Sequence, residues 1–269
     1  AYTSSILGVL HFSKDKIFGA PLLDPGLALY FFPLIILAGG LAAAIAGLLV
    51  AIPSYKTRGD YLAIITIAAN YIIISLIENL GVIGGSRGFM GMKKVVNAMG
   101  DTIDLPWMVI WVFIFTVATV WILRRYNSST FGKGVSAICQ DEVAAEIMSV
   151  DTNKVKTITF MLSSGLAGVA GGLFAYIIGY VNPGSFNILK STEVLVMVYL
   201  GGMASLSGAV MSAMFFTILL ELLRPLQIIK WVVIPLLLII VMQFRPEGIM
   251  GNRELSDIFP KLKRFYRFK

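Results

Sequence analysis

The chain has 269 residues, of which 57% are apolar and only 14% are charged, and its formal net charge is +7. Soluble globular domains carry about 25% charged residues and about 45–50% apolar ones, so this composition excludes a soluble enzyme and a disordered tail. The positive charge requires no nucleic-acid partner, because the basic loops of a membrane protein explain it. A single cysteine, Cys139, and a single histidine, His11, leave no cluster for a metal site, and we predict no catalytic residues.

Long uncharged runs predict an all-α, polytopic integral membrane protein. A membrane-crossing helix needs about 20 mostly apolar residues, whereas a helix of a soluble core would interrupt such a run with polar positions at helical spacing. We expect about five spanning helices plus a hairpin made of a broken helix. The expected segments are 27–52, 60–82, 106–123, 157–181, the two shorter legs 187–202 and 206–223, and 226–244.

The first predicted element, residues 1–12, is the end of a helix whose start is not in the sequence. The basic, apolar and small-residue pattern of a signal peptide is absent here. We therefore expect N-terminal spans to be missing. The next span, 27–52, carries the motif Ala43-x-x-x-Gly47, which favours close packing of membrane helices.

The span 60–82 carries polar residues on one stripe. Thr66, Asn70 and Glu78 are separated by four and eight positions, which places them on one helix face, and Tyr71 lies beside it. Polar groups inside a membrane are costly and are candidates for function by default. They predict the lining of a translocation path. Hydrogen bonding between helices, with Glu78 near the outer surface, is the alternative interpretation.

Two glycine-rich patterns bear on nucleotide binding. Residues 84–88 (GGSRG) do not follow a predicted strand, so they are not a dinucleotide fingerprint. The phosphate-binding pattern G-x-x-x-x-G-K-[ST] does not occur in the chain. We therefore expect no cofactor and no ATP bound by a P-loop of this chain.

The connector 128–156, between the spans 106–123 and 157–181, predicts a short helix over about 131–149 that begins at a Thr130 cap. Asp151 or Thr152 can cap the span that follows. Small and acidic residues recur on one face of the short helix, which favours docking of another protein. A solvated amphipathic connector is the alternative. The residues of this face are Glu142, Ala145, Glu146 and Ser149.

The region 187–223 must begin and end on the same side of the membrane if the neighbouring spans alternate. Residues 201–208 (GGMASLSG) offer a break in its middle, and irregular backbone at membrane depth is tolerated where it is buried in protein or lines a polar cavity. Gly201, Gly202 and Ser205 are therefore further candidates for the translocation path. An ordinary short turn between two thin spans is the alternative, so the region is a re-entrant or a full-span hairpin.

The distribution of lysine and arginine predicts the orientation. If the loop 53–59 is cytoplasmic, 14 of these residues lie on the cytoplasmic side and 8 on the other. An excess of basic residues marks the cytoplasmic side. We therefore expect a cytoplasmic C-terminus, with a single transmembrane domain over 1–251 and a basic cytoplasmic tail over 252–269.

Six segments of the chain carry motifs that occur together, in this order, in one family. They are 58–64 (RGDYLAI), 84–88 (GGSRG), 131–145 (FGKGVSAICQDEVAA), 168–186 (GVAGGLFA to GYVNPGSF), 199–208 (YLGGMASLSG) and 245–249 (RPEGI). These segments resemble the permease subunits of ABC importers for branched-chain amino acids, the LivM-like family, and the resemblance runs from Ala1 to about Gly251.

This resemblance implies a multi-pass subunit in the plasma membrane of a prokaryote. A second permease subunit, two cytoplasmic ATPases and an extracytoplasmic substrate-binding protein would be its partners in an ATP-driven importer. The helix at 131–149 would couple it to the ATPases. The residues implied for this coupling are Gly132, Asp141, Glu142, Ala145 and Glu146.

Three departures from the family pattern bear on substrate and docking. Tyr71 stands where the family often has a glutamate, and Ser86 and Arg87 replace its usual Pro-Asn. Ser136 and Cys139 replace two arginines of the coupling helix.

An ion-coupled secondary transporter and a non-transporting membrane scaffold subunit are the rival functions. The first needs membrane-buried charges and usually an internal repeat, and the sequence shows neither clearly.

Overall fold

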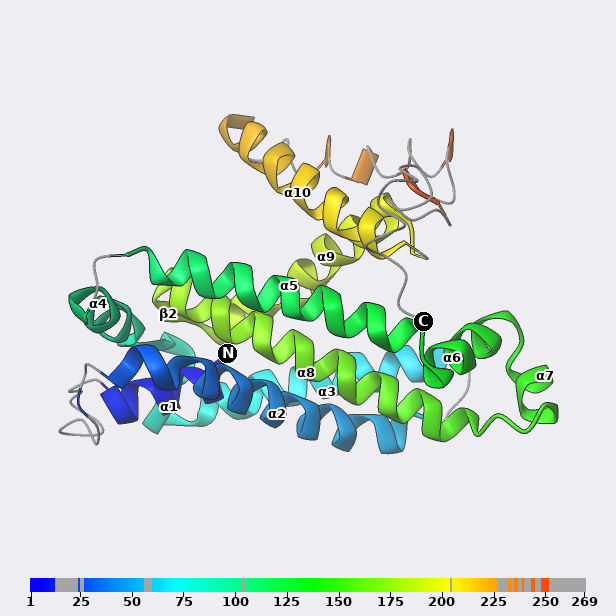
Figure 1. Ribbon diagram of the computed structural model, residues 1–269, viewed down its shortest axis with the longest axis horizontal. Helices are drawn as coiled ribbons and strands as arrows, with labels where there is room; N and C mark the ends of the chain where they lie inside the picture. Colours follow the sequence, from blue (N-terminus) through cyan, green and yellow to red (C-terminus); the bar gives the residue numbers. More distant parts are fainter. Residues whose placement is uncertain are drawn as a thin grey trace. The chain divides into compact units, whose positions relative to one another are not determined.

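The computed structural model describes residues 1–12, 24, 27–55, 60–102, 105–203, 205–226, 232–233, 235–236, 239, 243–244 and 248–251. Its described part is built of α-helices, short 3-10 helices and one two-stranded ladder, which confirms the predicted all-α class. The chain forms two compact units, Ala1–Ser185 and Phe186–Lys269, which are described separately below (Figure 1).

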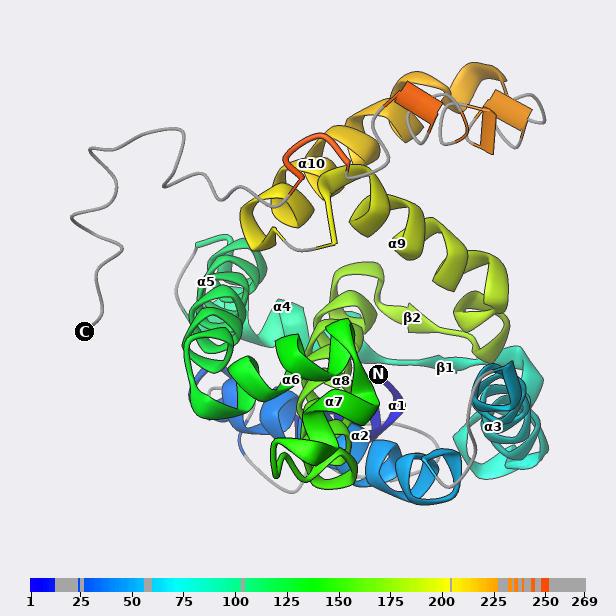
Figure 2. The same ribbon diagram turned by 90° about the vertical axis from the view of Figure 1, so that its right-hand side faces the viewer.

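Three long helices of the first unit run side by side: α2 (Ala28–Ser54), α5 (Trp107–Asn127) and α8 (Thr152–Ile178) (Figures 1 and 2). Each is long and apolar enough to cross a membrane. At 1.5 Å per residue, the 27 residues of α2 extend about 40 Å, more than the roughly 30 Å of a bilayer core. These helices confirm the predicted segments 27–52, 106–123 and 157–181.

Glycines bring α2 and α8 into close contact. A Cβ atom added to Gly168 would overlap the side chain of Ala43, and one added to Gly47 would overlap Ser164. The predicted small-residue packing is therefore confirmed as an α2–α8 interface. α1 (Tyr2–Phe12) packs against the same pair, where the buried Tyr176 hydroxyl donates to the Ser4 carbonyl at 2.9 Å.

The segment predicted as one span over 60–82 is bent. α3 (Asp60–Asn79) is followed by the 3-10 helices η2 (Gly81–Ile83) and η3 (Gly85–Arg87), and the two parts meet at 81°. Gly84 and Gly85 have φ of 90° and 50°, which glycine adopts without strain. The described residues therefore contain three candidate spans, or up to four if the bent pair counts as one.

A ladder and an amphipathic helix, both absent from the predictions, follow this bend. β1 (Phe89–Met90) pairs antiparallel with β2 (Tyr180–Val181), as Figure 2 shows. α4 (Met92–Thr102) then packs across the end of the helices opposite α6 and α7 (Figure 1). Met92, Val95 and Met99 lie on its buried face with no exposed surface, at spacings of three and four.

The second unit contains the predicted hairpin of two helices, α9 (Ile188–Gly201) and α10 (Leu206–Leu222), followed by η5 (Arg224–Leu226). Gly202 ends α9 with φ of 107°, and Leu200 packs with Phe216 between the helices. The predicted break is confirmed. Most of the predicted span 226–244 and the whole tail 252–269 lie outside the described residues.

Candidate functional site

The connector between α5 and α8 forms two helices, α6 (Thr130–Gln140) and α7 (Glu142–Ile147), rather than the predicted single helix over 131–149. Asp141 causes the break. Its backbone is extended, and its Oδ1 accepts hydrogen bonds from the Val143 and Ala144 amides at 2.9 and 3.1 Å. An aspartate that binds the amides just after it favours a new helix start over continuation of the old helix.

The caps around the connector only partly match the predictions. Ser129, not Thr130, caps α6, because its hydroxyl accepts from the Gly132 amide at 3.3 Å. Asp151 caps α8 as expected, by accepting from the Lys154 amide at 3.0 Å. A Cβ on Gly132 would overlap the carbonyl oxygens that end α5, so this glycine permits the tight passage from α5 into α6.

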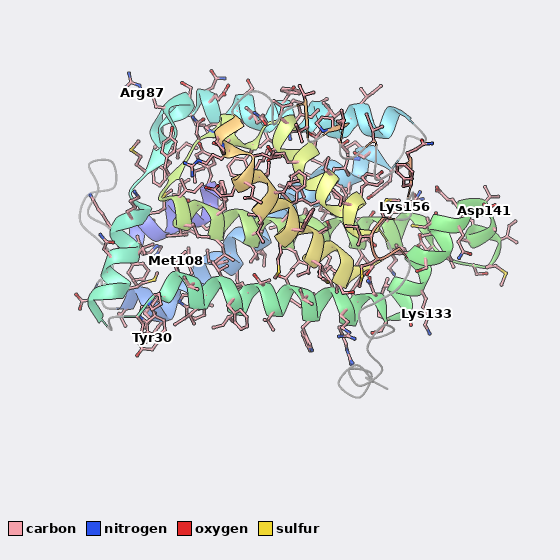
Figure 3. All side chains as sticks on the ribbon, turned by 90° about the horizontal axis from the view of Figure 1, so that it is seen from above. Tyr30, Arg87, Met108, Lys133, Asp141 and Lys156 are labelled. Atoms are coloured by element: carbon pink, nitrogen blue, oxygen red, sulfur yellow. The ribbon has the colours of Figure 1, made fainter. Side chains whose placement is uncertain are left out.

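The two carboxylates of the predicted docking face, Glu142 and Glu146, contact α8, and the docking role of this face stays a prediction. Glu142 forms an ion pair with Lys156 at 2.6 Å, and Ala145 is buried. The Thr152 hydroxyl donates to Glu146 Oε1 at 2.9 Å. Ser149 lies beyond the end of α7, with φ of 63°, so it does not belong to the stripe at all. Figure 3 shows Lys156 and Asp141 at the same end of the first unit.

Apolar side chains occupy the outward side of α7. Val143 is 61% exposed, and Ile147 and Met148 are each 78% exposed. We call these three residues the α7 apolar face. The predicted docking face did not include these residues, although Val143 and Ile147 are spaced four apart, as on one face of a helix. The three side chains lie outside the candidate spans, so they are available for contact with another protein.

The four polar candidates of α3 belong to the first unit. Thr66 is half-buried, while Asn70, Tyr71 and Glu78 are exposed on its surface. An asparagine and a glutamate exposed on an otherwise apolar helix are costly against lipid. Their assignment to a translocation path stays a prediction.

The glycine candidates of the second unit are buried at a close backbone crossing. Gly201 of α9 and Gly208 of α10 approach so closely that a Cβ on either would overlap the other's carbonyl oxygen. Ser205 is 2% exposed, and its hydroxyl accepts from the Gly208 amide at 3.0 Å. The Ile249 amide donates to the carbonyl of Leu200, and the Met250 amide to that of Gly201, at 2.9 and 3.2 Å. The place of Gly201, Gly202 and Ser205 in a path stays a prediction.

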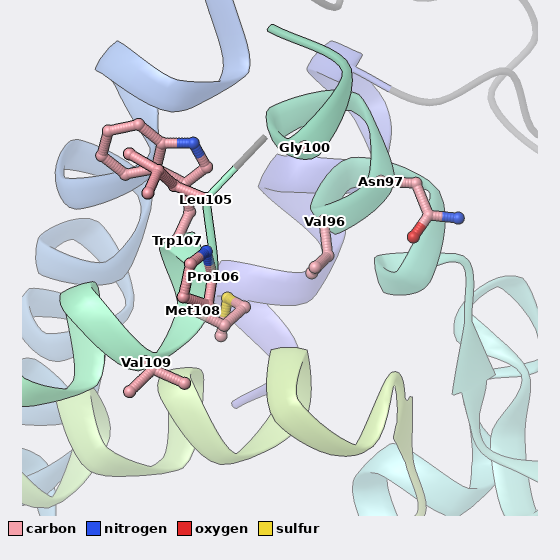
Figure 4. Close-up of a pocket in the computed structure, with 8 residues that line it drawn as sticks. All are labelled: Val96, Asn97, Gly100, Leu105, Pro106, Trp107, Met108 and Val109. Carbon is pink, nitrogen blue, oxygen red and sulfur yellow. The ribbon is translucent and has the colours of Figure 1, made fainter. Parts of the chain in front are cut away.

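A hollow of about 670 Å³ lies between the end of α4 and the start of α5 (Figure 4). Val96 and Met108 contribute apolar surface, and Asn97 contributes an amide. None of the predicted site residues line this hollow.

Among the described residues, no three His, Cys, Asp or Glu side chains are grouped so that they could hold a metal ion.

Known proteins are similar to most of this chain. A family model described as "Branched-chain amino acid transport system / permease component" matches residues 2–242. The high-affinity branched-chain amino acid transport system permease protein LivM of Escherichia coli K12 is 29% identical over 235 residues, which cover 78% of this chain and 55% of that protein. The permease protein LivH of the same strain is 28% identical over 188 residues, covering 68% and 56%.

A more distant relative comes from an archaeon. The probable branched-chain amino acid transport permease protein LivM of Methanocaldococcus jannaschii is 21% identical over 249 residues, which cover 86% of this chain and 71% of that protein. The chain spans about half the length of the bacterial LivM and LivH relatives. No solved structure matches it.

Proposed function

The chain belongs to the branched-chain amino acid transport permease family, and from this premise we propose that it is a membrane subunit of an ATP-driven importer for branched-chain or related amino acids. The match over residues 2–242, which includes α2, α5 and α8, carries the proposal. The subunit contributes to the translocation path, and a second permease subunit completes that path. An extracytoplasmic binding protein delivers the substrate.

The exposed polar stripe of α3 supports the proposal that a second permease subunit completes the path. Asn70 and Glu78 lie exposed on a helix whose other exposed side chains include Ile72 and Leu76. Membrane-embedded polar groups face protein or a water-filled cavity, because burial in lipid is costly. The face with Asn70 and Glu78 therefore lies toward the path or the second permease, and the apolar faces lie toward lipid.

The α6–α7 connector supports coupling to ATPase partners. It joins two helices long enough to span a membrane, so a displacement of the connector can move both of them. The α7 apolar face offers an ATPase subunit a surface that loses water on contact. The ATPases bind the nucleotide, and their closure rocks the permease between its outward and inward states.

We propose that this connector and the C-terminus lie on the cytoplasmic side of the plasma membrane of a prokaryote. The excess of lysine and arginine, 14 against 8, supports it. Single cysteines at Ser185 and Gln227, in a variant that lacks Cys139, test it in intact cells. Both should react with a membrane-impermeant thiol reagent, and labelling of only one of them would contradict the alternating arrangement.

Uptake by cells tests the function. Deletion of the gene should abolish accumulation of radiolabelled leucine, isoleucine or valine from micromolar concentrations, and a plasmid copy should restore it. Accumulation should stop when ATP is depleted and persist when an uncoupler collapses the proton gradient. The opposite pattern would indicate an ion-coupled transporter. Unchanged uptake of these and related amino acids after deletion would indicate a non-transporting scaffold subunit.

A further inference from the structure

Two side-chain contacts hold α7 against the first turns of α8. Lys156 Nζ lies 2.6 Å from Glu142 Oε1, with about 26% and 40% of the two side chains exposed. Thr152, which is only 3% exposed, donates its hydroxyl to Glu146 Oε1 at 2.9 Å. The two contacts are four residues apart on both helices, so they lie along one edge of each. They resist rotation of α7 as well as its separation from α8.

The same turns of α8 also contact the ends of two other long helices. The ring of Tyr55, at the end of α2, meets Phe160 edge to face at 6.2 Å between ring centres. Lys156 Nζ lies over the same ring, 6.0 Å from its centre. Tyr126, near the end of α5, hydrogen-bonds through its hydroxyl to Thr159 Oγ1 at 2.7 Å. Lys156 therefore lies where α7, α8 and the end of α2 meet.

α7 itself needs these contacts. A helix of six residues is unstable alone in water. Its backbone connections are the break at Asp141 on one side and the turn through Ser149 on the other. Neither connection is a continuous helix, so a push on α7 would be absorbed there unless its side chains were fixed to α8.

We propose that the Glu142–Lys156 ion pair, supported by the Glu146–Thr152 hydrogen bond, is the link through which a displacement of α7 is passed to α8 and to the helices packed on it. The four residues are positioning residues. Glu142 and Glu146 act within the chain, and contact with the ATPase is left to the α7 apolar face. The inference rests on the proposed function, since the displacement comes from the ATPase.

The test uses the complete transporter, reconstituted in liposomes with its permease partner, ATPases and binding protein. It compares Lys156→Met and Glu142→Gln with the wild type. Lys154→Met is the matched control, because Lys154 lies on the same turn of α8 with an exposed side chain. Amino acid imported and ATP hydrolysed are measured in the same vesicles, and their ratio is the readout. A variant that merely folded poorly would lower both in proportion and leave the ratio unchanged.

We expect Lys156→Met and Glu142→Gln to lower the ratio at least about fivefold, the lower end of the usual range of coupling between sites. ATP hydrolysis and the amount of bound ATPase should stay near those of the wild type. The exchanged pair, Glu142→Lys with Lys156→Glu, should recover most of the ratio. Lys154→Met should leave it unchanged.

A wild-type ratio in Lys156→Met would overturn the inference, and so would an exchanged pair as impaired as the single variants. Loss of ATPase binding in Glu142→Gln would also overturn it, since that carboxylate would then contact the partner. These outcomes differ from failure of the proposed function. In that case, wild-type vesicles would import no amino acid with ATP.

Discussion

The α7 apolar face leads to a prediction about docking of the ATPase. In the double variant Ile147→Ala with Met148→Ala, most of this surface is removed while the ion pair and caps of α7 remain. The two side chains contact little of their own chain, since each is 78% exposed. The variant should therefore fold and reach the membrane normally.

The exposed fractions of Ile147 and Met148 determine how much the Kd for the ATPase should change. Complete burial of an isoleucine or methionine side chain contributes about 1.5–3 kcal/mol. With 78% of each still available for burial, docking gains about 1–2 kcal/mol from each residue. Because truncation to alanine removes most of that gain, each substitution should raise the Kd for the ATPase by about 5- to 30-fold.

The assay is titration of the ATPase onto the permease pair held in lipid nanodiscs. Val109→Ala is the matched control, because Val109 is 67% exposed on α5 near the opposite end of the unit. Its Kd should equal that of the wild type. The wild-type Kd should also change little between low and high salt, since apolar contact is not screened. An unchanged Kd in the double variant, or wild-type binding that is lost in high salt, would refute the apolar contact.

Three further predictions concern helix packing, the polar stripe and the α7 cap. Gly168→Ala should destabilise the detergent-solubilised protein by about 1–3 kcal/mol in thermal unfolding, because the added Cβ overlaps α2. Gly171→Ala is the control and should not destabilise it, because a Cβ there meets only ordinary contacts at 3.4 Å or more. With Cys139 replaced, Asn70→Cys should react with a water-soluble thiol reagent and Ile72→Cys should not; equal reaction would contradict a path on one face. Asp141→Ala should weaken the α7 cap by about 0.5–2 kcal/mol, seen as faster amide exchange over 142–147, and unchanged exchange would contradict the capping role.

The long helices could be predicted because a helix that crosses lipid needs a long run of uncharged, mostly apolar residues. Uncharged runs of sufficient length become helices, and α2, α5 and α8 follow that rule. The Ala43-x-x-x-Gly47 spacing in α2 also indicated close packing, although it did not identify α8 as the partner helix. The hairpin break at Gly202 could be predicted because glycine and serine cluster there.

Other features depended on contacts that a one-dimensional pattern does not contain. The sequence pattern singles out Glu142 and Glu146 but not their partners Lys156 and Thr152, which become neighbours because the chain breaks at Asp141 and reverses at Ser149. The pairing of residues 249–250 with the end of α9 likewise joins segments about 50 positions apart. α4 was not among the expected elements, although Met92, Val95 and Met99, between the segments 60–82 and 106–123, show helical spacing.

We propose an ATP-driven importer of which this chain is a subunit. Liposomes that hold the two permeases and the ATPases, with binding protein and radiolabelled leucine, isoleucine, valine or a related amino acid outside, test it most directly. With ATP and Mg²⁺ enclosed, at least one of these should accumulate against its gradient, and with enclosed ADP, or without the binding protein, none should. Accumulation that needs an imposed proton or sodium gradient and ignores ATP would contradict the account.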